Sequence, residues 1–147
     1  MDELHPAVVH LPIGAVLLYP WFELARSLTG QRILSLAALA VLAVALLGSM
    51  VASATGEAAY EAAVETGFSH ELLGGHEEYA EMLPWALIVV LGVRLVLERR
   101  WGPSPRAGWL GFGLGLVLTG YVTWVGYTGG TLVYEHGVGV QGVVPEP

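Results

Sequence analysis

The stretch Ile33–Gly56, ILSLAALAVLAVALLGSMVASATG, contains no charged residue. An α-helix rises about 1.5 Å per residue, so this stretch is long enough to cross the roughly 30 Å of hydrocarbon in a bilayer. It is the clearest membrane span in the chain. We therefore expect a helical membrane protein, and the rest of the sequence is interpreted around this span.

Three further apolar runs flank this stretch. The first begins near Pro6, the third is the short uncharged run 82–93 extended on both sides, and the fourth is the glycine-rich run 107–134. We expect spans at about 6–28, 32–56, 76–98 and 106–131. Together they predict an all-α, four-helix transmembrane bundle that forms a single domain over residues 1–147. Gly111 and Gly115 in the last run form a GxxxG pair, which favours close helix approach.

The composition excludes several classes of protein and of site. Apolar residues make up 54% of the 147 residues, which is too many for an ordinary soluble domain. Thirteen acidic residues outnumber six basic ones, all of them arginine, which argues against nucleic acid as a partner. Cysteine is absent, so disulfides, thiolate zinc sites, iron–sulfur clusters and covalently attached haem are excluded.

The segment between the second and third spans is acidic. Glu57, Glu61 and Glu65 recur every four residues beside alanines, which predicts an external amphipathic helix. We expect it to break near Gly67 and again at Gly74-Gly75. Gly129-Gly130 is expected to end or bend the fourth helix in the same way.

The arginines predict the orientation. None lies on the other side of the spans. The six that flank the first and third connections are Arg26, Arg32, Arg94, Arg99, Arg100 and Arg106. By the positive-inside rule, both connections are cytoplasmic and both termini are outside.

The five histidines are then all expected at the outer face. His10 precedes Arg26 by 16 residues and His76 precedes Arg94 by 18. At 1.5 Å per residue both imidazoles lie roughly 24–27 Å from the arginine face. His5 lies just above His10, His136 lies in the tail, and His70 lies in the outer loop.

Matched imidazoles on two helices favour a haem b electron-transfer protein, with His10 and His76 as axial ligands and His136 or His5 as second choices. The rival hypothesis is a zinc or copper site. Its candidate ligands are His10, His76 and His136 with Glu57 or Glu77. A third hypothesis is a structural subunit without a cofactor, in which the histidines cap helices at the interface. The first two favour a non-enzymatic protein over an enzyme.

The motifs HPAVVHLPIG (5–14), HEEYAE (76–81) and GGTLVYEHGVGV (129–140) together resemble a prokaryotic membrane-protein family catalogued as domain of unknown function 2231. The resemblance covers essentially the whole chain and implies four spans in the prokaryotic cytoplasmic membrane. Some relatives carry Rieske or cytochrome c modules, which implies an external redox partner of that type beside the bilayer. The oligomeric state is left open, with a homo-oligomer as one option. The motif residues are His5, Pro6, His10, Pro12, Tyr134, His136 and Gly137.

Overall fold

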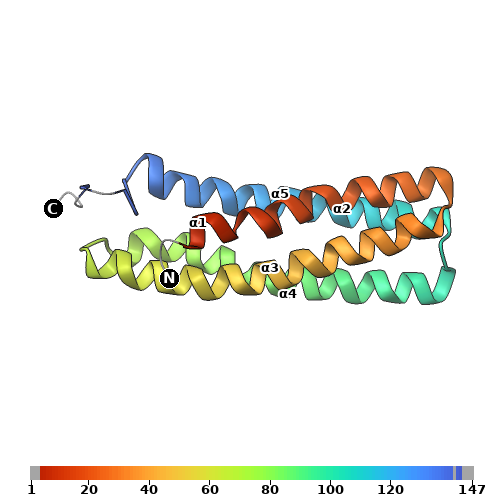
Figure 1. Cartoon of the computed structure of the whole chain (residues 1–147), viewed down its shortest axis with the longest axis horizontal. Coiled ribbons are helices and arrows are strands. Elements are labelled where there is room, and N and C mark those ends of the chain that lie inside the picture. The colour runs from red at the N-terminus through yellow and green to blue at the C-terminus, as the bar shows by residue number, and fades with distance from the viewer. Residues whose placement is uncertain (1–3, 141, 144–147) are drawn as a thin grey trace.

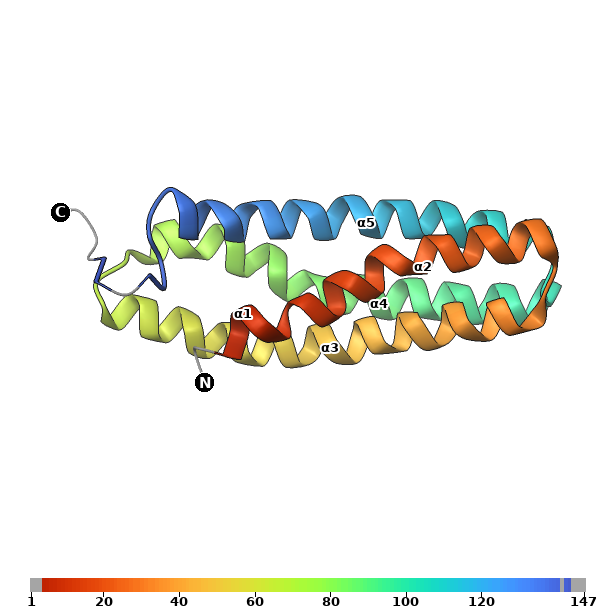
Figure 2. The same cartoon turned by 45° about the horizontal axis from the view of Figure 1, so that its top comes forward.

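The computed structural model describes residues 4–140, 142 and 143. Its helices form an elongated bundle (Figures 1 and 2). In chain order they are α1 (His5–Val8), α2 (His10–Thr29), α3 (Arg32–Glu65), α4 (His70–Trp101) and α5 (Pro105–Tyr134). Only Val9 lies between α1 and α2, so these two helices form one span. The described chain then has four helices long and apolar enough to cross a membrane. The predicted all-α, four-helix bundle is confirmed.

The helices are longer than the expected spans. α3, α4 and α5 contain 34, 32 and 30 residues, whereas a bilayer needs about 20. Both ends of the described chain lie toward the same end of the bundle, and α1 begins part-way along it (Figure 2). Past the start of α1, the helices that continue toward this end of the bundle are α3, α4 and α5. We call this the histidine end, and the opposite end, with the α2–α3 and α4–α5 turns, the arginine end.

The acidic segment is helical, as expected, but it is the continuation of α3 rather than a separate helix. The break at Gly67 is confirmed, since this residue has a φ of +104°. The predicted break at Gly74-Gly75 is wrong, because both glycines lie inside α4. Ser69 caps α4 through its side chain, and buried Leu73 packs with Ala63 and Phe68. These contacts outweigh the roughly 1 kcal/mol that each glycine costs a helix.

The predicted break at Gly129-Gly130 is also wrong, because α5 continues to Tyr134. The chain turns back only afterwards, at Gly137, which has a φ of +71°. The amide of Val138 then donates to the carbonyl of Leu132 at 2.9 Å. The tail thus folds against the end of the bundle one to two turns later than the sequence suggested.

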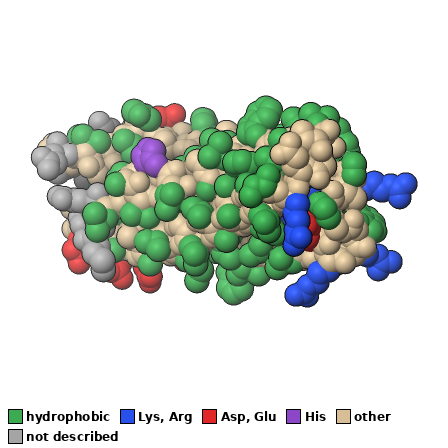
Figure 3. Space-filling model, turned by 45° about the vertical axis from the view of Figure 1, so that its right-hand side comes forward, with side chains coloured by type: hydrophobic (Ala, Val, Ile, Leu, Met, Phe, Trp, Pro, Cys, Tyr) green, Lys and Arg blue, Asp and Glu red, His purple; other side chains and the backbone are tan. Residues whose placement is uncertain are grey.

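The centre of the bundle is apolar. Val16, Tyr19, Leu42 and Leu87 are fully buried there, and they separate the two ends. On the face seen in Figure 3, apolar side chains cover the middle, arginines gather at one end, and most of the carboxylates lie at the other. This distribution matches a bundle whose middle lies in lipid.

Small residues on α5 let α2 approach closely, as the GxxxG pair predicted. A Cβ at Gly111 would lie 2.6 Å from Glu23 Cδ. A Cβ at Gly115 would lie 2.9 Å from Pro20 Cβ and 3.0 Å from Pro20 Cα, which is backbone and cannot move aside cheaply. The contact between α2 and α5 therefore depends on these glycines.

We predict that Gly115→Ala destabilises the bundle by about 1–3 kcal/mol, because the added methyl overpacks the α2–α5 contact. A Cβ at Gly120, on the same helix, would have nothing within 4 Å. Gly120→Ala should therefore be neutral or stabilise by about 0.5–1 kcal/mol. Unfolding in mixed detergent measures both, and equal effects of the two variants would contradict the packing account.

Candidate functional site

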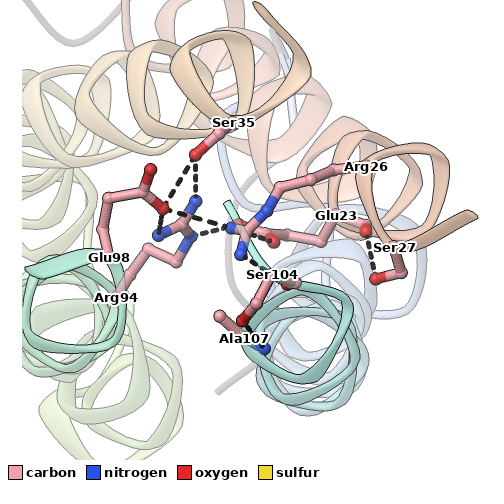
Figure 4. A network of polar contacts seen from close by, with 8 residues as sticks. All are labelled: Glu23, Arg26, Ser27, Ser35, Arg94, Glu98, Ser104 and Ala107. Carbon is pink, nitrogen blue, oxygen red and sulfur yellow. Dashed lines mark hydrogen bonds and ion pairs between the residues drawn. The ribbon is translucent and has the colours of Figure 1, made fainter. Parts of the chain in front are cut away.

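Four charged side chains from α2 and α4 meet inside the bundle at the arginine end (Figure 4). Glu23, Arg26 and Arg94 are completely buried, and the Glu98 side chain is 26% exposed. Ser35 of α3, also buried, joins them. We call these five residues the ionic cluster.

Hydrogen bonds connect the whole cluster. The Arg94 guanidinium donates to Glu23 Oε1, to Glu98 Oε2 at 2.9 Å and to Ser35 Oγ at 2.7 Å. Ser35 Oγ in turn donates to Glu98 Oε2 at 2.9 Å. Arg26 donates to Glu23 Oε2 and to the carbonyl of Ser104, each at 3.2 Å. The cluster therefore ties together α2, α3, α4 and the α4–α5 turn.

The cluster contains two positive and two negative charges and leaves no net charge. Buried ions in a membrane protein are tolerated when they are paired and hydrogen-bonded in this way. Glu23 and Glu98 were not among the residues predicted from the sequence, and Arg26 and Arg94 were expected only at the cytoplasmic flanks. The available signal was the spacing: Glu23 and Arg26 are separated by three residues and Arg94 and Glu98 by four, which places each pair on one helix face.

Three histidines at the histidine end contact other helices, and two of them are partly buried. These two are His5, which bonds to α3, and His76, which bonds to α5. His5 Nδ1 lies 3.1 Å from the carbonyl oxygen of Ala52 and 3.2 Å from Thr55 Oγ1 on α3. A carbonyl oxygen only accepts, so Nδ1 of His5 carries the proton. In the neutral ring Nε2 is then an unprotonated nitrogen with a free lone pair.

His76 also bonds through Nδ1 to a neighbouring helix. Its Nδ1 lies 3.0 Å from Thr128 Oγ1 on α5. Thr128 Oγ1 also lies 2.9 Å from the carbonyl oxygen of Val125, and a hydroxyl that donates its one proton to that carbonyl accepts from His76. In that arrangement Nε2 of His76 is also unprotonated, and no hydrogen bond between described residues engages Nε2 of either ring.

Two glycines make room for these rings. A Cβ at Gly56 would lie 3.0 Å from Cε1 of His5, and a Cβ at Gly129 would lie 2.8 Å from Cε1 of His76. Gly129 is thus needed for packing against an imidazole, which explains a glycine inside a continuous helix. His76 also lines a surface cleft of about 200 Å³ between α4 and α5, and this cleft includes His136, Tyr79 and Thr131.

The remaining candidates are not part of this pair. His10 is exposed on α2, and Glu57 is exposed on α3. His70 is exposed and its Nδ1 is 2.7 Å from the hydroxyl of Tyr60. Glu77 follows His76 on α4 and is only partly buried. Among the residues that the structure describes, no group of three or more His, Asp or Glu side chains could hold a metal ion.

The sequence model of a family described as "Predicted membrane protein (DUF2231)" matches residues 1–142. The chain belongs to this family. The resemblance drawn from the end motifs is therefore correct. No curated protein and no solved structure matches the chain.

The structure gives several motif residues of this DUF2231 chain a physical role. His5 bonds to α3, and Pro12 is buried against Gly48, where a Cβ would lie 3.1 Å from Pro12 Cδ. Gly137 supplies the positive φ that turns the tail back. His136 is exposed beside the cleft that His76 lines.

We predict that Glu23→Gln destabilises this DUF2231 protein by about 3–5 kcal/mol, because it leaves the Arg94 charge buried without its carboxylate. Glu23→Gln combined with Arg94→Gln should be less destabilised than the sum of the single variants. Detergent-induced unfolding of the four proteins gives the coupling energy. Strictly additive effects would show that the two side chains do not act as a pair.

Proposed function

We propose that the histidine end binds haem b through Nε2 of His5 and Nε2 of His76, and that the protein carries electrons at the membrane. The observation that carries this proposal is the pair of partly buried imidazoles with protonated Nδ1 and bare Nε2. Bare Nε2 is the atom that a metal ligand needs, and a hydrogen bond from Nδ1 is the usual support of a ligating histidine.

The number of donors favours haem over a bare ion. A zinc site uses three or four protein ligands, whereas haem iron needs only axial ligands because the porphyrin supplies the remaining nitrogens. Among the described residues, no set of three His, Asp or Glu side chains could hold a metal ion. Zinc or copper is therefore the less favoured cofactor.

The neighbouring residues hold the two rings in place. Ala52 and Thr55 fix the orientation of His5, and Thr128 fixes that of His76. In this proposal they keep each Nδ1 protonated and so keep each Nε2 available. The haem would supply the one-electron redox change.

The space beside His76 also bears on the proposal. The cleft of about 200 Å³ is smaller than the 300–1,000 Å³ typical of ligand sites. α1 is only four residues long, buries none of its residues, and is separated from α2 by Val9. We infer that α1 and the segment of α3 that holds His5 move outward together to admit the porphyrin, so that the bonds of His5 to Ala52 and Thr55 are kept.

The charge at this end suggests the partner. No arginine of the chain lies at this end. Its exposed carboxylates are those of Glu57, Glu61, Glu65, Glu71, Glu78, Glu81 and Glu135. Such a surface attracts a positively charged partner and speeds its association. An external redox protein of the Rieske or cytochrome c type, with a basic docking face, fits this end.

We predict that His5→Ala and His76→Ala each lose most of the haem that the parent retains after purification. His10→Ala and His70→Ala should retain it, because both rings are exposed and neither belongs to the pair. The measurement is haem per protein from the visible spectrum, with zinc and copper determined on the same samples. These two controls also report on any general effect of losing a histidine.

Two outcomes would contradict the proposal. Haem loss in His10→Ala but not in His5→Ala would move the site to the outer surface of α2. A parent protein that contains stoichiometric zinc or copper and no haem after expression with added haem precursor would replace haem by a metal ion.

We also propose that the arginine end is cytoplasmic, in a prokaryotic cytoplasmic membrane, with both termini outside. The two buried arginines are not needed for this assignment. It is supported by the four exposed arginines at this end, which are Arg32, Arg99, Arg100 and Arg106. Because the chain has no cysteine, single-cysteine variants are clean reporters. An impermeant thiol reagent should label Glu65→Cys in intact cells and should not label Arg32→Cys or Arg100→Cys. The reverse pattern would invert the orientation.

A further inference from the structure

An apolar groove runs between α4 and α5 at the arginine end, away from the histidine site. Its volume is about 380 Å³, and its lining is almost wholly hydrocarbon and indole: Val93, Leu97, Trp109, Leu110, Gly113 and Leu114. The groove opens on the outer surface of the bundle, where lipid lies. Gly113 forms an open part of its floor, since a Cβ there would have nothing within 4 Å.

Two arginines stand at the end of this groove. Arg100 follows Leu97 by three residues on α4, and Arg106 precedes Trp109 and Leu110 by three and four residues on α5. Residues three or four apart lie on one helix face, so each arginine is one turn beyond the groove lining on the same face. Both are exposed, and no ion pair in the described part of the chain engages them.

We propose that this groove is a binding site for an anionic glycerophospholipid, with an acyl chain in the groove and the phosphate between Arg100 and Arg106. Basic side chains at the end of a groove between membrane helices are a common setting for anionic head groups. Guanidinium groups bind phosphate oxygens through paired N–H donors, so arginine suits this role.

Charge complementarity decides between lipid classes. The carboxylates near this end, Glu23 and Glu98, are engaged by Arg94 and Arg26 inside the ionic cluster. No exposed acidic side chain therefore neutralises Arg100 or Arg106 in the described part of this end. A head group with a net negative charge gains from both arginines, whereas the choline of a zwitterionic lipid brings a third positive charge beside them.

Trp109 reports on the groove directly. The other four tryptophans are 44–71% exposed, so they can be replaced by phenylalanine to leave Trp109 as the single fluorophore. The reporter protein is titrated in mixed bilayers with phosphatidylglycerol or phosphatidylcholine that carries brominated chains, which quench indole on contact. We expect the relative affinity for the anionic lipid to exceed that for the zwitterionic lipid by about tenfold or more.

Matched variants locate the site. Arg100→Gln and Arg106→Gln should each lower the preference for phosphatidylglycerol about fivefold. Arg32→Gln removes the same charge at the start of α3, outside the groove, and should leave the preference nearly unchanged. Gly113→Leu fills the groove and should abolish the selective quenching, whereas Gly120→Leu, also at an open position, should not.

Equal affinities for the two lipids in the parent protein would overturn the proposal. So would a loss of preference in Arg32→Gln as large as that in Arg106→Gln, because it would show a nonspecific effect of net charge. Retained selectivity in Gly113→Leu would place the lipid elsewhere. The unfolding transition of each variant, measured in parallel, verifies that the bundle is intact.

Discussion

The ion pair between Glu23 and Arg94 is the interaction on which the arrangement of this bundle most depends. Neither charge can be left in a bilayer without its partner, so the rotation of α2 about its axis is fixed relative to α4. Arg26, Ser35 and Glu98 extend the same constraint to α3 and to the α4–α5 turn. Gly111 and Gly115 then let α5 pack against the same face of α2. Polar pairing and close packing thus specify one arrangement of four otherwise apolar helices.

The two ends of the molecule have different chemistry. At one end the charges are buried and mutually neutralised, and at the other two imidazoles keep a free nitrogen each. The largest fully buried side chains between them are Val16, Tyr19, Leu42 and Leu87. The ionic cluster therefore lies at the end of the bundle opposite the histidines, and the apolar centre separates the two.

The sequence predicted the four spans because hydropathy is summed over a segment and needs no knowledge of its neighbours. The end motifs predicted the family, and the GxxxG spacing predicted the close approach at Gly111 and Gly115, because both patterns lie within short segments. The sequence could not predict which histidines face inward. Counting residues gives depth but not rotation, and His5 and His10, five residues apart, point about 140° away from each other on a helix. The inner positions of Glu23 and Arg94 depended likewise on the rotation of two separate helices.

Electron paramagnetic resonance of the purified, oxidised protein tests the proposed haem site, because the spin state of ferric haem depends on the ligands of the iron. Two neutral imidazoles from His5 and His76 would impose a strong ligand field, so we predict a low-spin ferric signal. Replacing His5 by alanine should convert that signal to high-spin haem bound by His76 alone, or remove it. A parent protein reconstituted with haem that shows only high-spin or unbound haem would contradict the claim that these two histidines form the site.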